Sequence, residues 1–409
     1  MLMLRALRNR SIALLWLGQA LSAVGDEIYR VALIWLAVGL IGADTGYLAA
    51  GQSAALLGMS FIAGRWADRW DHFKTLIGVD LARACVVMTP VIVSRFVPVT
   101  LPWLWGMALA LSALGAFFDP ALQAMLPRFS RDASMLKAAT GLMSTTIRMA
   151  RIAGPAVIGA LTTFLPTIHF FTLDALTFAL SALSISMLTR HPRQRFALKP
   201  SSNPAGFWES VTSGFRLTGQ DPILRSVLFA RATASGAWNL AFGLGLALLV
   251  HQIAPHDVRA FGAVIASYGC GNLASALVLG NTERKRPTRL LFTGYVWLGA
   301  GFLLTSIAPT LGWLMAAAAF GGFGGPMNDI PFIDLVQARF KIEEIPKIFR
   351  LRMALDTTAT LLCLLASPLL FRELAVPTVI AICGAISVVV GLWGLLTVSR
   401  RVLSEQDPG

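Results

Sequence analysis

An apolar stretch from residue 11 to residue 41 constrains the fold most, because it is long enough to cross a bilayer yet carries charges in its middle. A membrane-spanning helix needs about 20 predominantly apolar residues. Asp26, Glu27 and Arg30 lie near the centre of this stretch. Each ionisable side chain at membrane depth costs roughly 3 kcal/mol on insertion scales, so these three must face protein or water. The stretch therefore predicts neighbouring helices that build a polar environment around it.

The overall composition places the chain in the polytopic membrane class. Of its 409 residues, 56% are hydrophobic and 13% are charged, whereas soluble proteins carry about 25% charged residues. Long apolar runs recur along the chain, which predicts an all-α membrane protein. The short basic N-terminus leads into a helix too long for a cleaved signal peptide, so we expect an uncleaved anchor.

The spacing of the apolar runs predicts twelve transmembrane helices in two six-helix bundles. The expected helices span about 11–40, 45–64, 75–97, 101–126, 138–164, 168–189, 223–250, 259–280, 289–308, 311–337, 348–371 and 374–398. These ranges give an N-terminal bundle (1–189), a cytoplasmic linker (190–222) and a C-terminal bundle (223–409). Within the linker, the sequence from residue 207 onwards is amphipathic, which favours an interfacial helix over a soluble linker helix. Weak matches between the two halves support related bundles.

The distribution of positive charge predicts the orientation. The net charge is +13, and most Lys and Arg residues fall in terminal and loop segments on one side of the predicted helices. Arg95, Arg259 and Arg372 alone fall in loops on the other side. This asymmetry follows the positive-inside rule and places both termini in the cytoplasm. Because no basic segment forms a domain of its own, we do not expect nucleic-acid binding.

No pattern typical of an enzyme, a cofactor or a metal site occurs. The four cysteines lie inside apolar runs, and no Cys/His spacing suits a metal. The glycine-rich run 320–326 has neither the following Lys-Ser/Thr nor the preceding strand of a phosphate loop. We interpret it as a place where the helix bends. We therefore expect no catalysis, no cofactor and no ATP-driven chemistry in this chain.

Polar residues inside the predicted helices are the main functional signal. Besides the first helix, they are Asp80, Arg83, Asp119, Arg148, Arg151, Asp174, Arg231, Trp238, Asn239, Asn328 and Asp329. Asp26 and Glu27 are both placed to pair with Arg30, four and three residues away. If one acid neutralises Arg30, the other is left unpaired in its own helix. Burial favours the protonated form of such a carboxyl and a nearby arginine favours the ionised form, so it can load and release a proton.

Other members of this set have structural interpretations. Asp80 and Arg83, three residues apart and near a cytoplasmic end, fit a pair that braces the adjacent loop, and Asp174 fits a structural role. Arg148 and Arg151 share one helix face and suit either a scaffold ion pair or contact with an anionic substrate. Proline in Gly154-Pro155 predicts a kink beside a closely packed seam.

Several segments resemble the major facilitator superfamily, in the branch that holds the enterobactin exporter and macrolide efflux pumps. The segments are LWLGQALSAVGD (15–26), GRWADRWDHFK (64–74), GAFFDPALQAMLP (115–127), RIAGPAVIGAL (151–161) and FTLDALTFALSALSI (171–185). The resemblance implies a twelve-helix carrier with alternating access, usually driving export with protons, in which helices 1, 4, 7 and 10 line a central cavity.

Residue roles follow from combining the polar set with this resemblance. The candidates for proton coupling are Asp26, Glu27, Asp119 and Asp329. The candidates for substrate binding are Arg30, Arg148, Arg151, Arg231, Trp238, Asn239 and Asn328. The candidates for gating are Gly64, Asp68, Arg69, Gly154 and Pro155.

The expected function is secondary active transport of a small amphiphilic or anionic solute by alternating access. We expect proton-coupled export of a drug or siderophore, by a monomer in the bacterial cytoplasmic (inner) membrane. Its partners would be a small-molecule substrate, protons and the lipid bilayer. Two alternatives stay open at this point. One is uptake of an anionic or metal-chelate solute, which the intramembrane arginines favour. The other is lysophospholipid flipping, which needs a laterally open cavity.

Overall fold

Helices dominate the computed structural model, which describes residues 7–66, 71–130, 133–161, 164–189, 207–255, 257–280, 286–341 and 344–398. Across these ranges no residue lies in a β-strand. Eight helical segments in the same ranges are long and apolar enough to cross a membrane. The expectation of an all-α membrane protein is therefore confirmed.

The chain divides into two compact units, each described by itself below. Unit 1 comprises Met1–Ala37 and Ala54–Gly206, and unit 2 comprises Val38–Ser53 and Phe207–Gly409. The end of the first long helix and the start of the next thus belong to unit 2, although both lie in the first sixth of the sequence.

Unit 1 is built from long helices whose apolar faces meet in one core. Its helices are α2 (Arg10–Ile41, up to residue 37), α3 (Thr45–Trp66, from residue 54), α4 (His72–Val93), α5 (Leu101–Phe129), α6 (Ala133–Leu161) and α7 (His169–Thr189). The Asp71 carboxylate caps the start of α4 by accepting from the backbone N–H of Phe73 and Lys74. Helix α4 packs against both α5 and α7. Leu15, Leu76 and Met125 lie fully buried in the core that these helices share.

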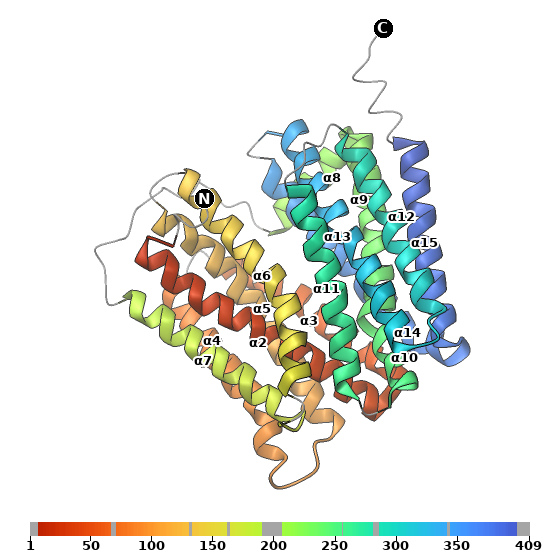
Figure 1. The fold of residues 1–409 in the computed structure, drawn as a ribbon. Coiled ribbons are helices and arrows are strands. Elements are labelled where there is room, and N and C mark those ends of the chain that lie inside the picture. Colours follow the sequence, from red (N-terminus) through yellow and green to blue (C-terminus); the bar gives the residue numbers. More distant parts are fainter. Residues whose placement is uncertain are drawn as a thin grey trace. The chain divides into compact units, whose positions relative to one another are not determined.

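Unit 2 is built mainly from helices that run side by side. They are α8 (Phe207–Gln220), α9 (Pro222–Trp238), η4 (Asn239–Gly245), α10 (Leu246–Ile253), α11 (Val258–Gly280), α12 (Pro287–Ser306), α13 (Leu311–Arg339), α14 (Ile345–Glu373) and α15 (Val376–Leu396), together with the short helix η1 (Gly42–Asp44). Helix α12 lies between α13 and α15, and α13 also packs on α11 (Figure 1). Asp221 caps α9, and Pro222 occupies its first turn.

One of the predicted helices differs in the structure, because a π-helical segment lies within it. The single helix predicted at 223–250 is divided by a π-helical segment, η4, into α9 and α10. Such segments are rare and occur often at functional sites. This one follows directly after Trp238 and begins at Asn239, two residues that the sequence assigned to substrate binding.

The glycine-rich run has a packing role in the structure. Helix α13 continues unbroken from Leu311 to Arg339 through that run. A Cβ on Gly321 would lie 3.3 Å from the Cα of Gly301 on α12. A Cβ on Gly322 would collide with the backbone carbonyl of Tyr268 on α11. Small residues allow helix backbones to approach closely, so these glycines permit α13 to pack tightly between α11 and α12.

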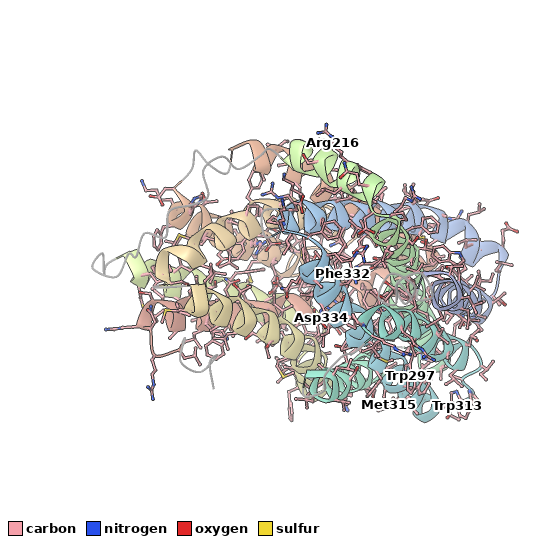
Figure 2. All side chains as sticks on the ribbon, turned by 90° about the horizontal axis from the view of Figure 1, so that it is seen from above. Arg216, Trp297, Trp313, Met315, Phe332 and Asp334 are labelled. Atoms are coloured by element: carbon pink, nitrogen blue, oxygen red, sulfur yellow. The ribbon has the colours of Figure 1, made fainter. Side chains whose placement is uncertain are left out.

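The amphipathic segment before the second half of the chain is the helix α8. Val211 and Thr218 are buried on one of its faces, which packs on α14. Phe215 is 53% exposed, and Arg216 points away from the body of unit 2 (Figure 2). The exposed mixture of an aromatic and a basic residue suits the predicted interfacial position, which stays a prediction.

Candidate functional site

In unit 1, Glu27 on α2 is the acid that neutralises Arg30. Nε of Arg30 donates to the Glu27 carboxylate at 2.9 Å, and Nε of Arg151 on α6 lies 3.8 Å from its other oxygen. Helix α6 comes this close because Gly154 has no side chain: a Cβ there would lie 2.6 Å from Cβ of Glu27. Glu27 is therefore held by two arginines, and Gly154 lies in a closely packed seam as expected.

Asp26 is the acid of α2 that remains without such a partner. Its side chain is exposed, as is that of Asp119 on α5. Within the described part of the chain, no hydrogen bond or ion pair to Asp26 is present, and the basic group that acts on it electrostatically is Arg83. The same guanidinium acts on Asp119. The sequence left open which acid pairs with Arg30, and the fold answers that question in favour of Glu27.

Arg83 is thus more central than the sequence indicated. It is 8% exposed, although it projects from α4 among apolar helices. Its guanidinium carbon lies 4.6 Å from the ring centre of Phe118 and 5.4 Å from that of Phe178, so aromatic faces from α5 and α7 stabilise the charge. Nη1 of Arg83 is 3.8 Å from the fully buried Asp80 carboxylate. The expected pair of Asp80 and Arg83 is present, its role as a brace stays a prediction, and Arg83 also acts electrostatically on the acids of other helices.

In unit 2, Arg231 on α9 joins two other helices through their acids. Its Nη2 donates to Asp329 on α13 at 2.7 Å, and its Nε donates to Asp356 on α14 at 3.1 Å. Nε of Arg352 approaches the same Asp356 carboxylate at 4.0 Å. With two arginines and two carboxylates, the cluster is balanced in charge. Arg231 is therefore paired with acids of two other helices.

The ring of Phe332 on α13 lies against both guanidinium groups of this cluster. The guanidinium carbons of Arg231 and Arg352 lie 5.4 and 5.5 Å from its ring centre. Sequence reasoning missed Arg352 and Asp356. The signal was available, because the two residues are four positions apart within the predicted helix 348–371, as Asp26 and Arg30 are within the first helix.

Three aromatic side chains gather where α9 meets η4. The indole Nε1 of Trp238 donates to the Tyr268 hydroxyl of α11 at 2.9 Å. Phe242 stacks on Trp238 with ring centres 5.2 Å apart, and lies 4.1 Å from the ring centre of Tyr268. Trp238 and Tyr268 are half-buried. This arrangement offers aromatic faces and little charge, which suits a hydrophobic or planar ligand.

Asn239 and Asn328 have different environments. Nδ2 of Asn239 donates to the Thr360 hydroxyl of α14 at 3.0 Å and to the Ser235 carbonyl at 3.0 Å. Asn328 is 6% exposed and lies against Gly294 of α12, where a Cβ would collide with its amide oxygen. Asn239 therefore remains at the aromatic cluster, whereas Asn328 is placed in a helix contact.

Several predicted residues lie outside the described part of the structure. Asp68 and Arg69 fall in a segment that is not described, and Gly64 lies in the last turns of α3. The side chains of Arg148 and Pro155, both on α6, are not described. Their roles in gating or binding stay predictions. Among the described residues, no group of three His, Cys, Asp or Glu side chains could hold a metal ion.

Sequence comparison identifies the family. Residues 3–325 match the model of a family described as transmembrane secretion effectors. The chain is 24% identical to the MFS-type transporter YfiS of Bacillus subtilis strain 168, over 97% of this chain and 96% of the relative. It is 24% identical to macrolide efflux protein A of Streptococcus pyogenes, over 88% and 89% of the two chains. It is 26% identical to the multidrug efflux pump Tap of Mycobacterium tuberculosis, over 79% and 78%.

Structural comparison agrees on the fold. The transporter PepTSo of the POT family matches with a TM-score of 0.74 and 12% identity, over 98% of this chain and 99% of that chain. A bacterial homologue of the lysosomal transporter Spinster matches with a TM-score of 0.65 and 15% identity, over 95% of each chain. These identities carry information about the fold alone. The family comprises membrane transporters rather than enzymes. The chain therefore belongs to the transmembrane secretion effector family of the major facilitator superfamily and is a membrane transporter.

Proposed function

We propose that this transporter exports a hydrophobic compound, neutral or cationic, in exchange for protons. In this proposal one binding site opens in turn to each side of the membrane. The observation that carries the proposal is that two neighbouring acids of α2, Glu27 and Asp26, have different surroundings. Glu27 is held by Arg30 and Arg151, while the neighbouring Asp26 is exposed and has no hydrogen bond to another described residue. An accessible carboxyl can exchange its proton with water, whereas the Glu27 carboxylate is already engaged by two arginines.

The arginines Arg30 and Arg231 are already paired with acids, which supports a neutral or cationic substrate. Arg231 donates to two carboxylates and Arg30 donates to one. An anionic substrate would have to displace these acids, and breaking a desolvated ion pair is costly. By contrast, Asp26 and Asp119 are accessible acids, and a positively charged group could replace the proton there. In unit 2, the aromatic cluster of Trp238, Phe242 and Tyr268 offers a surface of its own for a hydrophobic compound.

The relatives support the direction of transport. Two of them are named for efflux of macrolides and of multiple drugs. By this analogy and by the basic loops, we propose twelve spans in a bacterial cytoplasmic membrane, with both termini in the cytoplasm. Export by a monomer would then move compounds out of the cell as protons enter.

Transport by proteoliposomes tests the coupling. Vesicles that contain the full-length protein are loaded with acid and given ethidium, a fluorescent lipophilic cation, and separately the macrolide erythromycin. We expect accumulation of at least one probe in the acidic lumen. Asp26→Asn should abolish accumulation but preserve exchange of probe at equal pH, because exchange needs no net proton movement. Asp44→Asn, which alters an acid outside this region, is the matched control. Indifference of the parent protein to the gradient would refute the coupling.

A pair of probes with the same shape and opposite charge tests the substrate class. Tetraphenylphosphonium is a cation and tetraphenylborate is an anion, so a difference between them reports charge rather than size. We expect tetraphenylphosphonium to stabilise the purified protein against heat, and the double variant D26N/D119N to lose this effect. Preference for tetraphenylborate would instead support the alternative of an anionic solute. Movement of a labelled lysophospholipid without either preference would support the flipping alternative.

A further inference from the structure

A polar seam in the interior of unit 1 is separate from the accessible acids just discussed. Asp174, Thr177 and Ser181 are spaced by three and four residues, so they share one face of α7. This helix packs against α4, which carries Asp80. A Cβ on Gly25 of α2 would lie 2.5 Å from Oδ1 of Asp174. The seam is therefore enclosed by three helices of one unit.

The acids of this seam are deeply buried and poorly satisfied. Asp80, Asp174 and Ser181 are each 0% exposed. The Ser181 hydroxyl lies near enough to Asp80 to act on its carboxylate, but no described residue completes a hydrogen bond of good geometry to either oxygen of Asp80, to Oδ2 of Asp174 or to the Ser181 hydroxyl. An ionised carboxylate without hydrogen bonds is very unfavourable in such surroundings. A protonated carboxyl avoids this cost and can donate a hydrogen bond to a neighbouring oxygen.

The arginine near the seam carries too little positive charge to neutralise all the carboxylates around it. Arg83 is the basic group that acts electrostatically on Asp80 and Asp174, and it also acts on the accessible Asp26 and Asp119. One guanidinium cannot neutralise four carboxylates. No hydrogen bond joins Arg83 to another described residue, and its guanidinium lies against the aromatic faces of Phe118 and Phe178. Glu27 also acts on Asp26, but its carboxylate is paired with Arg30 and Arg151.

A proton fits this seam better than a metal cation. The guanidinium lies 3.8 Å from Asp80 and would repel a second permanent cation. Within the described ranges no cluster of three metal-type ligands exists. A proton needs a single oxygen, and binding it removes the excess negative charge.

We propose that Asp80 and Asp174 together bind a proton in the interior of unit 1, and that Arg83 exchanges between this pair and the accessible acids Asp26 and Asp119. When a proton enters, an O–H bond forms on one buried carboxylate and Arg83 is free to pair with Asp26. When the proton leaves, that bond breaks and Arg83 returns to the buried pair. The inference deepens the proposed function and rests on its proton coupling.

Infrared spectroscopy of the full-length protein in lipid tests this proposal without a transported substrate. A protonated buried carboxyl gives a carbonyl stretching band that an ionised one lacks. We expect such a band at neutral pH, its loss on alkaline titration, and its absence in the double variant D80N/D174N. Asp44→Asn, at an exposed ion pair, should leave the band unchanged. Absence of the band from the parent protein at every pH would overturn the proposal, because an ionised structural pair predicts that result.

A second variant covers the case in which the double variant does not fold. Arg83→Met keeps both carboxyls and removes their counter-ion, so the band should persist to more alkaline pH than in the parent. An unchanged titration would refute the role of Arg83. Replacing Na⁺ by choline should have no effect, and a band suppressed by Na⁺ would overturn the choice of a proton. Because these measurements need no transport, a normal band combined with pH-independent transport would refute the coupling and leave the proton site standing.

Discussion

Arg372 donates two hydrogen bonds from one nitrogen to the carboxylate of Asp44, at 2.6 and 2.7 Å. The pair joins the end of α14 to η1, which lies between α2 and α3. Both residues belong to unit 2 although 328 positions separate them. Their side chains are 61% and 38% exposed, and exposed ion pairs contribute only about 0–1 kcal/mol. The close packing beside this pair should therefore matter more than its charges.

Two variants separate the packing from the charge. A Cβ on Gly46 would collide with the Ser367 hydroxyl and lie 3.0 Å from the Leu364 carbonyl oxygen. Gly46→Val should therefore lower the free energy of unfolding by about 1–3 kcal/mol, as overpacking does. Arg372→Gln should lower it by less than about 1 kcal/mol. Thermal unfolding in detergent measures both, and an equal loss in the two variants would contradict this ranking.

Glu27→Gln should destabilise the protein. The substitution leaves Arg30, and to a lesser degree Arg151, without a charged acceptor in a partly buried place. An unsatisfied buried polar group costs about 1–3 kcal/mol. Arg151→Gln is the matched control and should cost less, because Arg151 is 62% exposed and its pair with Glu27 is longer. Unfolding midpoints of the two variants provide the comparison, and a larger loss in Arg151→Gln would show that the ion pair is assigned wrongly.

Arg231→Met should destabilise unit 2 in a pH-dependent way. It leaves Asp329 and Asp356 without their shared donor, and removal of one partner of a buried pair costs about 3–5 kcal/mol. The loss should shrink as the pH falls, because the two carboxylates can then take up protons. Unfolding measured at neutral and mildly acidic pH tests this sign. The triple variant R231M/D329N/D356N should recover part of the stability at neutral pH, and no recovery would argue against a charge effect.

Trp238→Ala should weaken binding of a hydrophobic probe. The variant removes the indole that stacks on Phe242 and donates to Tyr268. Truncation of an aromatic anchor at a binding site typically costs 2 kcal/mol or more, which is roughly 30-fold in affinity. Trp313→Ala is the control, since Trp313 is 44% exposed at the start of α13 (Figure 2). Affinity for tetraphenylphosphonium measures the effect, and equal losses would remove Trp238 from the proposed site.

Gly301→Ala should destabilise the α12–α13 contact. A Cβ on Gly301 would collide with the Cα of Gly321, which belongs to the glycine-rich run. Because both atoms are backbone or fixed to it, the helices must separate, at a cost of about 1–3 kcal/mol. Gly312→Ala introduces the same methyl group where no atom lies within 4 Å, and should be neutral or slightly stabilising. Unfolding midpoints distinguish the two variants, and tolerance of Gly301→Ala would refute tight packing there.

The sequence predicted the helical membrane fold well, since a lipid solvent imposes long apolar helices and a bias of basic loops. It also located the intramembrane charges of α2, α5, α9 and α13. The three-residue spacing of Asp80 and Arg83 indicated their local pair, but not the action of Arg83 on the acids of other helices. The apolar pattern did not indicate the π-helical segment that begins at Asn239.

What the sequence alone determined is which residues cannot face lipid, because the cost of a charge in hydrocarbon depends on that residue and its helix. What the tertiary structure decided is which partner each charge has. Glu27 rather than Asp26 pairs with Arg30, and Arg231 selects Asp329 together with Asp356. Ion pairing depends on separations of a few ångströms between helices far apart in the chain. Those separations are set by side-chain packing, to which glycines such as Gly154 and Gly301 contribute, and not by any single helix.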